Sequence, residues 1–209
     1  MTAGKIYLMM NKPCGYVCSA VSDSHKTVYE LLSPELQQLV QGVKRGERLH
    51  TVGRLDCDTS GLLLFTNDGM FSHKIAATAV PEALEGPHKN AIILKTYLAT
   101  LKNQVPQDLQ TSYITRAAQG LMLPPEKKAL EQKAAPAELT FINETNCRIT
   151  ITEGKFHEVR RIFLALGNEV TALKRIAIGN LELPQDLAPG QYKSFTPEQN
   201  TFTPEQILF

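Results

Sequence analysis

The chain has 209 residues, of which 43% are hydrophobic and 21% are charged, and its formal net charge is +1. This length and composition suit a globular protein with a substantial core, and the near-zero charge excludes a large uniform field that attracts nucleic acid. No apolar run approaches membrane-spanning length, and the four cysteines lack the paired spacing of a zinc knuckle. We therefore expect reduced cysteines, no metal site and a cytoplasmic location.

The first half of the chain alternates apolar runs with turn signals. The run from Gly61 to Thr66 is too short for a typical helix and ends at Asn67-Asp68-Gly69, so it predicts a buried strand. Strands are expected over residues 5–11, 16–20, 49–52 and 61–66. Helices or short helical turns are expected over residues 27–32, 34–40 and 70–77, and an exposed loop over residues 81–90.

The second half contains a clear amphipathic pattern. Phe156, Val159, Phe163 and Leu166 recur at three- and four-residue steps, which predicts a helix over residues 156–166. A surface helix is expected over residues 106–118, and irregular, mobile chain over residues 121–136. Strands are expected over residues 91–101, 137–142, 147–152, 169–178 and 192–195. Because no regular βαβ repeat is present, we predict an α+β fold with a mixed, mostly antiparallel central sheet and flanking helices.

The loop before residues 61–66 concentrates reactive groups. Arg54, Asp56 and Asp58 lie close together between two glycines, and the expected strand follows at once. A buried strand is rigid, so a polar loop that leads into it can hold a reactive group in a fixed position. An ion pair that merely braces the loop explains the same residues equally well on composition alone.

Three segments resemble, in order, the motifs of one enzyme family. GRLDCDTSGLLLFTNDG at residues 53–69 strongly resembles the catalytic motif of pseudouridine synthases, most closely the RsuA-like branch that modifies ribosomal RNA. KTYLATL at residues 95–101 and EGKFHEVRRIFLALGNEVTALKRIAIG at residues 153–179 look like the second and third motifs. The resemblance implies a pseudouridine synthase-like catalytic domain over residues 1–209, either as one unit or as two lobes around a central cleft.

The resemblance also implies a reaction and three catalytic residues. Pseudouridine formation cleaves the uridine N1–C1′ bond, turns the base and rejoins it through C5, with no metal or redox cofactor. Asp56 matches the family's catalytic carboxylate, and Tyr97 matches its active-site tyrosine, whose ring would stack on the displaced uracil. Arg160 matches the basic position of the third motif, and we expect it to pair with Asp56 because a buried carboxylate requires a nearby cation.

Other residues of the three motifs are expected to bind RNA or to shape the site. Asp58 and Thr59 are expected to shape the loop, and His157 to be structural or to face RNA. Glu158 stands where relatives often carry Gln. The basic residues expected to bind RNA on one face around the loop are Arg54, Lys155, Arg161, Lys174 and Arg175.

The expected partner is ribosomal RNA or a ribosomal precursor particle, bound by a monomer away from any membrane. Many relatives place a small S4-type RNA-binding domain ahead of the catalytic domain, and the chain leaves no room for one before its first expected strand. Site selection is then expected to rest on the catalytic domain itself. This favours the large ribosomal subunit as the source of the target uridine.

Two other functions fit parts of the pattern. Residues 56–60, Asp-Cys-Asp-Thr-Ser, approach the D-x-D-x-T signature of haloacid-dehalogenase-type phosphatases, which phosphorylate one Asp and require magnesium. Ser60 in place of Thr and the lack of regular strand–helix alternation weaken that match.

The second alternative is a non-catalytic RNA-binding relative. Asp56, Tyr97 and Arg160 argue against it, because RNA affinity alone does not require a carboxylate beside the RNA backbone.

Overall fold

The computed structural model describes residues 4–41, 44–76, 93–127 and 129–197. The helices are α1 (Pro34–Gln41), α2 (Gly69–Ala76), α3 (Gln107–Ala118) and α4 (Glu158–Ala165), with single 3-10 turns η1 (Val28–Leu31) and η2 (Arg45–Glu47). The strands are β1 (Tyr7–Lys12), β2 (Tyr16–Val17), β3 (Lys26–Thr27), β4 (His50–Val52), β5 (Thr59–Thr66), β6 (Lys95–Leu101), β7 (Met122–Leu123), β8 (Gln132–Lys133), β9 (Glu138–Phe141), β10 (Asn146–Ile151), β11 (Val170–Ile178), β12 (Leu181–Glu182) and β13 (Tyr192–Ser194).

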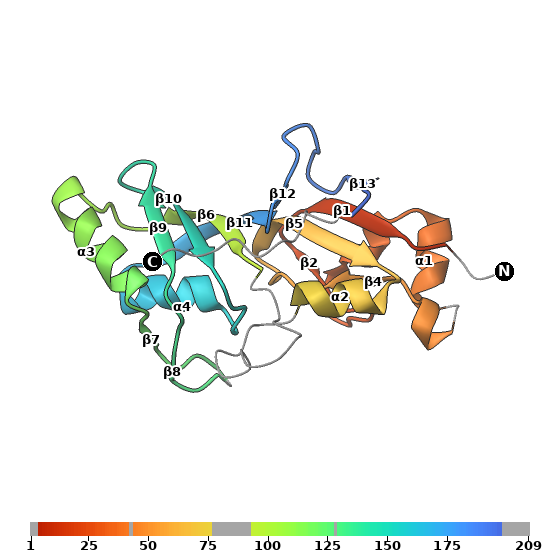
Figure 1. The fold of residues 1–209 in the computed structure, drawn as a ribbon, viewed down its shortest axis with the longest axis horizontal. Coiled ribbons are helices and arrows are strands. Elements are labelled where there is room, and N and C mark those ends of the chain that lie inside the picture. Colours follow the sequence, from red (N-terminus) through yellow and green to blue (C-terminus); the bar gives the residue numbers. More distant parts are fainter. Residues whose placement is uncertain (1–3, 42–43, 77–92, 128, 198–209) are drawn as a thin grey trace, which may run out of the picture.

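A nine-stranded sheet forms the frame of the molecule (Figure 1). Its strand order is β13-β1-β5-β11-β6-β10-β9, and β4 and β12 add to β5 and β11. The pairing of β5 with β11 is parallel, and the other pairings described in this sheet are antiparallel. The predicted α+β fold with a mixed, mostly antiparallel sheet is therefore confirmed.

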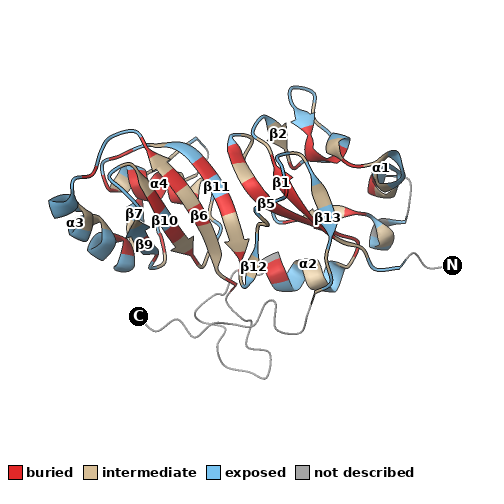
Figure 2. Cartoon of the chain, turned by 90° about the horizontal axis from the view of Figure 1, so that it is seen from above, coloured by how far each residue is buried: buried red, intermediate tan, exposed pale blue. Residues whose placement is uncertain are grey.

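The helices are distributed around the sheet in a simple way. In Figure 1, α2 and α4 lie along the same side of the sheet, whereas α1 and α3 lie at its two ends. Figure 2 shows that the buried residues gather along the strands of the sheet, while α1 and α3 expose their outer sides. No helix within the described ranges is long and apolar enough to cross a membrane.

Strand β5 is the central strand that the apolar run after the polar loop predicted. Leu63 and Phe65 belong to the larger core cluster on one face, and Leu62 and Leu64 to a smaller cluster on the other face. Successive strand residues point to opposite faces, so a strand covered on both sides requires a continuous apolar sequence. All four side chains are fully buried. This burial fixes the end of the loop that leads into β5.

The parallel seam between β5 and β11 depends on Gly61. Gly61 lies opposite Arg175 in the register and has a φ of 102°. A Cβ atom at this position would lie 2.2 Å from the Arg175 carbonyl oxygen, so the two backbones approach closely only because residue 61 has no side chain. The seam joins the strands β13, β1 and β5 to the strands β11, β6, β10 and β9.

Several expected elements differ from the observed ones in extent. The strand expected over residues 16–20 is only Tyr16–Val17, and the irregular stretch 121–136 contains the hairpin β7–β8. That hairpin forms because Leu123 and Ala134 are buried in the larger core cluster, a long-range contact that local composition does not reveal. The expected loop over residues 81–90, and residues 91 and 92 of an expected strand, lie outside the described residues.

We predict that Gly61→Ala destabilises the protein far more than Gly15→Ala. Both glycines have positive φ, 102° and 86°, but a Cβ at Gly15 meets nothing within 4 Å. Positive-φ strain alone costs about 1–3 kcal/mol, so Gly15→Ala measures that term without the clash. Urea unfolding of both variants tests the prediction, and equal losses in the free energy of unfolding would contradict the tight seam.

Candidate active site

A cavity of about 320 Å³ lies where the loop before β5 meets β6, β11 and the start of α4. The loop contributes Arg54 and Asp56, and β6 contributes Lys95 and Tyr97. The segment that begins α4 contributes His157, Glu158 and Arg160, and β11 contributes Arg175. Residues that are about a hundred positions apart in the sequence are thus brought to one concave site. Such a cavity with convergent polar groups is the best candidate for a functional site in the described part of the chain.

A buried lysine ammonium shapes the loop that carries Asp56. Lys12 has 0% exposure, and its Nζ donates to the carbonyl oxygens of Asp56 at 3.0 Å and Thr59 at 2.8 Å. It also donates to Pro13 at 3.1 Å and Cys57 at 3.4 Å. Burial lowers the pKa of Lys12, and nearby cysteine and aspartate groups partly oppose this shift. The sequence placed this lysine in a turn after the strand expected over residues 5–11, whereas the structure places it at the end of β1.

Asp56 faces a histidine and stays accessible to water. Its side chain is 40% exposed, and Oδ1 lies 3.7 Å from Nε2 of His157. Nδ1 of the same ring lies 2.8 Å from Oε1 of Glu126, which follows β7. The ring of Phe156 stacks on the imidazole with centroids 3.9 Å apart. The sequence did not identify His157 or Glu126 as neighbours of Asp56. The positive φ of His157, 47°, is uncommon for a residue other than glycine, although histidine adopts it more often than most residue types.

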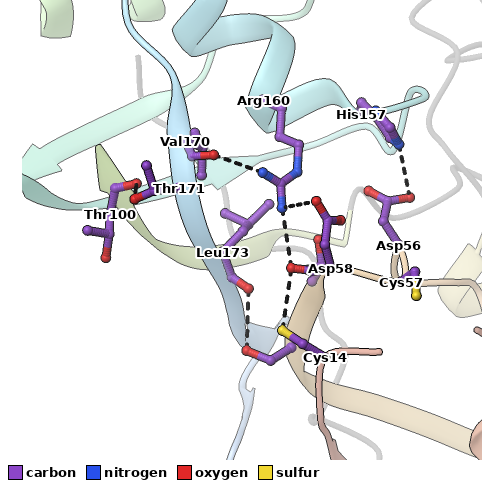
Figure 3. Close-up of polar contacts among 12 residues, drawn as sticks. Cys14, Asp56, Cys57, Asp58, Thr100, His157, Arg160, Val170, Thr171 and Leu173 are labelled. Atoms are coloured by element: carbon purple, nitrogen blue, oxygen red, sulfur yellow. Dashed lines mark hydrogen bonds and ion pairs between the residues drawn. The ribbon is translucent and has the colours of Figure 1, made fainter. Parts of the chain in front are cut away.

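Arg160 contacts Asp58 rather than Asp56, so the expected Asp56–Arg160 pair is wrong. Its Nη2 lies 2.9 Å from Oδ2 of Asp58, and its Nη1 donates to the Val170 carbonyl oxygen at 2.9 Å. Figure 3 shows Asp58 turned toward Arg160 and Asp56 turned toward His157. The physical reason is exposure: Asp56 keeps its hydration, so it does not require the cation that a fully buried carboxylate would need.

Arg161 is a structural residue, which corrects its expected role in RNA binding. It has 0% exposure, and its guanidinium donates to the carbonyl oxygens of Pro124 and Leu130, each at 2.8 Å. Longer bonds reach Leu123 and Phe156, each at 3.3 Å. The guanidinium therefore ties the β7–β8 hairpin to α4. An RNA phosphate cannot reach it in this conformation.

The remaining basic residues divide between the surface and the cavity. Arg54 and Lys174 are exposed, and Lys155 pairs with Glu153. Arg175 is 3% exposed and donates from Nε to the Leu62 carbonyl oxygen at 2.8 Å, so its expected place on the outer RNA-binding face is also corrected. Alternation along β11 explains the difference, because Lys174 and Arg175 must point to opposite faces of the sheet.

Tyr97 and Lys95 share the cavity face of β6. Tyr97 is 7% exposed and lies opposite Arg175 in the antiparallel register. Lys95 donates from Nζ to the Glu153 carbonyl oxygen at 3.0 Å. Burial, followed by the nearby Arg175 charge, lowers the pKa of Lys95, while Glu158 and Glu153 oppose the shift. The sequence included Lys95 in a motif without assigning it a place in the site.

Glu158 is a buried carboxyl on the cavity wall. It is 4% exposed, and Oε2 accepts a hydrogen bond from the Lys155 amide at 2.8 Å. Burial is the largest cause that raises the pKa of this carboxyl, to about 7. Glu153 raises the pKa further, whereas the Lys155 amide, the Lys155 charge and the Lys95 charge lower it. A neutral or a charged side chain thus faces the cavity, depending on pH.

The fold argues against the phosphatase alternative. A haloacid-dehalogenase-type site requires strands and helices in regular alternation, and the sheet around Asp56 is mostly antiparallel. The residue at which that signature would end, Ser60, donates to the Leu173 carbonyl oxygen at 3.4 Å across the seam. Its position is explained by strand pairing.

Comparisons with known proteins agree with the motifs and with the fold. The family model for RNA pseudouridylate synthase matches residues 6–165. Ribosomal small subunit pseudouridine synthase A of Escherichia coli (strain K12) is 39% identical over 94% of this chain and 73% of its own length. The corresponding enzyme of Haemophilus influenzae is 37% identical over 91% of this chain and 70% of its own length.

Solved structures lead to the same assignment. The crystal structure of a pseudouridylate synthase has a TM-score of 0.73 at 36% identity and covers 92% of this chain and 71% of its own. The archaeal box H/ACA sRNP Nop10–Cbf5 complex matches at a TM-score of 0.52, 16% identity, 88% of this chain and 51% of its own, which supports the fold alone. The chain therefore belongs to the RNA pseudouridylate synthase family, a family of isomerases, as its three motifs predicted.

Proposed function

We propose that this protein converts a uridine of small-subunit ribosomal RNA to pseudouridine, with Asp56 as the catalytic carboxylate. The observation that carries the proposal is the cavity in which Asp56, Tyr97 and Arg175 meet. The relatives that span 94% of the chain are named for the small subunit, so the expected large-subunit target finds no support in them. The proposed partner is the RNA or a precursor particle, which implies a cytoplasmic location, and the proposed acting form is a monomer.

The roles of the site residues follow from the reaction. Cleavage of N1–C1′ and rejoining through C5 require a carboxylate beside the ribose and a site that excludes water while the base is detached. Asp56 lines the cavity and its side chain is 40% exposed, so a flipped nucleotide can reach it from solvent. Tyr97 supports the detached ring by stacking, which is worth about 1–3 kcal/mol per base. That energy offsets part of the few kcal/mol needed to extrude the base.

Two residues act by positioning Asp56. His157 contacts the carboxylate and is itself fixed by Glu126 and by the Phe156 ring, so it limits how Asp56 can turn. Arg160 acts through Asp58, because its ion pair and its bond to the Asp58 carbonyl oxygen at 3.3 Å hold the turn that follows Asp56. Arg160 is thus a positioning residue in this proposal and does not touch the reacting atoms.

The phosphate contacts of the proposed complex come from the exposed basic residues. Arg54 is exposed at the cavity, and Lys155 lies at its wall beside Glu153. Lys174 is exposed on the other face of β11, so any phosphate that it binds lies outside the cavity. Phosphate contacts make affinity fall as salt rises. Arg161 and Arg175 contribute no such contact in this arrangement, because their guanidinium groups are buried.

We predict that Asp56→Asn abolishes turnover and leaves folding and RNA affinity nearly intact, because an amide has the size of a carboxylate but not its nucleophilicity or basicity. The test maps pseudouridines in both ribosomal RNAs of a strain that lacks the gene and carries either the wild type or the variant. Asp108→Asn, an exposed change on α3, is the matched control. If the wild type adds a pseudouridine to large-subunit RNA, the proposed small-subunit target is refuted. If a pseudouridine still forms with Asp56→Asn, the catalytic role of Asp56 is refuted.

A graded series at Tyr97 separates stacking from proton transfer. Tyr97→Ala removes the ring and should lower the single-turnover rate at saturating RNA by at least about tenfold, since stacking is worth about 1–3 kcal/mol. Tyr97→Phe keeps the ring and should slow the reaction only if the hydroxyl takes part in removing the C5 proton. Tyr113→Phe on α3 is the control. Full activity of Tyr97→Ala would remove Tyr97 from the site.

Glu158 predicts a pH dependence of stability and of activity. Between pH 4.5 and about 7 the folded chain keeps a proton that the unfolded chain has lost, so the free energy of unfolding should fall as pH rises through this window. The fall is on the order of 3 kcal/mol and should be absent in Glu158→Gln, which can still accept the Lys155 bond. Above pH 7 the wild type should also lose activity relative to the variant, because a second negative charge enters the cavity of Asp56.

Urea unfolding and single-turnover rates from pH 4.5 to 8.5 measure both effects. Glu131→Gln, an exposed change of the same kind on the loop between β7 and β8, is the control and should follow the wild type. Parallel pH profiles of Glu158→Gln and the wild type would show that Glu158 does not titrate in this window.

A further inference from the structure

The buried side-chain polar atoms that lack a hydrogen-bond partner within the described residues all belong to residues that line the proposed active site. They are Oγ1 of Thr59, Nε of Arg160 and Nη2 of Arg175. Buried polar groups are nearly always hydrogen-bonded, because an unmet donor or acceptor loses its water without compensation. The Arg160 guanidinium already makes an ion pair and carbonyl bonds through its other nitrogens. Arg160 thus uses both of its terminal Nη nitrogens, whereas the unpartnered atom of Arg175 is itself a terminal nitrogen, so Thr59 and Arg175 are the pair that requires an explanation.

A second threonine on the same strand shows the usual solution. Thr66 ends β5, is 0% exposed, and donates from Oγ1 to the Ile6 carbonyl oxygen at 2.7 Å. The same oxygen accepts the Asp68 amide at 2.9 Å. Thr59 begins β5, is 1% exposed, and has no such partners for its hydroxyl. The contrast indicates that the Thr59 hydroxyl is placed for a group that comes from outside the chain.

Arg175 lies opposite the proposed stacking residue, Tyr97, and Thr59 lies one strand farther along the sheet. Thr59 is opposite Leu173 on β11, and Arg175 is opposite Tyr97 on β6, so the three residues occupy three adjacent strands. Nε of Arg175 donates a hydrogen bond to the Leu62 carbonyl oxygen, and this bond fixes the orientation of the guanidinium. Nη2 of Arg175 has no hydrogen-bond partner and can donate to a ligand. Asp56 is 40% exposed, whereas Thr59 and Arg175 are almost fully buried, so these two lie deeper than the carboxylate.

We infer that Thr59 and Arg175 recognise the uracil edge formed by N3–H and O4, and that this edge supplies the partners that both side chains lack. The inference rests on the proposed function. The ribose must face Asp56, which is reachable from solvent, so the edge of the base farthest from the ribose enters the deep end. A guanidinium only donates, so Arg175 binds the O4 carbonyl oxygen, and the Thr59 hydroxyl accepts N3–H. Cytosine presents an amino group and a bare N3 at this edge, and the pair therefore selects against it.

The pair Thr59→Val and Thr66→Val tests the role of the Thr59 hydroxyl. Valine keeps the shape and strand preference of threonine and removes only the hydroxyl. Thr59→Val should leave the melting temperature unchanged or higher, because it deletes an unpartnered group, and should lower kcat/KM by about tenfold, the worth of one good hydrogen bond. Thr66→Val should lower the melting temperature by several degrees and keep its activity. Equal melting losses, or full activity of Thr59→Val, overturn the inference.

Recognition of the base is tested in the Asp56→Asn background, which binds RNA without turnover under the proposed function. The probes are one RNA with uridine, cytidine or 4-thiouridine at the target position. The unmodified pocket should prefer uridine to the other two by about tenfold. Adding Arg175→Lys should reduce the preference over 4-thiouridine, which differs from uridine only at the atom assigned to Arg175, and adding Thr59→Val should reduce the preference over cytidine, which lacks N3–H. An unchanged preference overturns the inference, even if pseudouridine is formed. If the wild type forms no pseudouridine but the base preference behaves as stated, the proposed function fails and the binding site stands.

Discussion

The loop that carries Asp56 depends on one buried ammonium. Lys12 ends β1 and lies opposite Gly61 in the antiparallel register with β5, so strand pairing delivers its side chain beneath the loop. There the charge is removed from water and offset by four backbone carbonyl oxygens, three of which belong to Asp56, Cys57 and Thr59. A buried ammonium without these partners would be strongly unfavourable, and carbonyls without a donor would leave the turn unsatisfied. The charge and the loop geometry therefore require each other.

The seam between β5 and β11 extends this constraint to the rest of the site. Only a residue without a side chain at position 61 lets β11 approach, and that approach places Arg175 between Gly61 on β5 and Tyr97 on β6. The loop and β5 thus supply the carboxylate and the hydroxyl on one side of the seam, and β11 and β6 supply the guanidinium and the ring on the other. Neither side of the seam contains a complete site, so the motifs that form it are widely separated in the sequence.

The sequence predicted the parts of the structure that local pattern determines. The apolar run of β5, the amphipathic α4 and the absence of βαβ repeats led to the correct fold class, and the motifs led to the family. The sequence did not predict which of the basic residues are exposed and which are buried. Arg160 and Arg161 are neighbours of the same type, and only the hairpin β7–β8, folded over α4 by long-range burial of Leu123, makes one of them a core residue. The contact of His157 with Asp56 accompanies a positive φ, which is uncommon even for histidine and which no local pattern in the sequence indicates.

The burial of these charges bears on how the protein would select its substrate. The basic residues Lys12, Arg161 and Arg175 are buried, so they do not contribute to the positive charge that the protein surface presents to RNA. The formal net charge of +1 includes all three. Attraction of RNA over long distances is correspondingly weak, since only surface charge steers a polyanion efficiently. Discrimination must then come from groups that act at contact distance after the nucleotide has entered. A guanidinium fixed by the backbone and a hydroxyl on a buried strand meet this need, because both are in place before the substrate arrives.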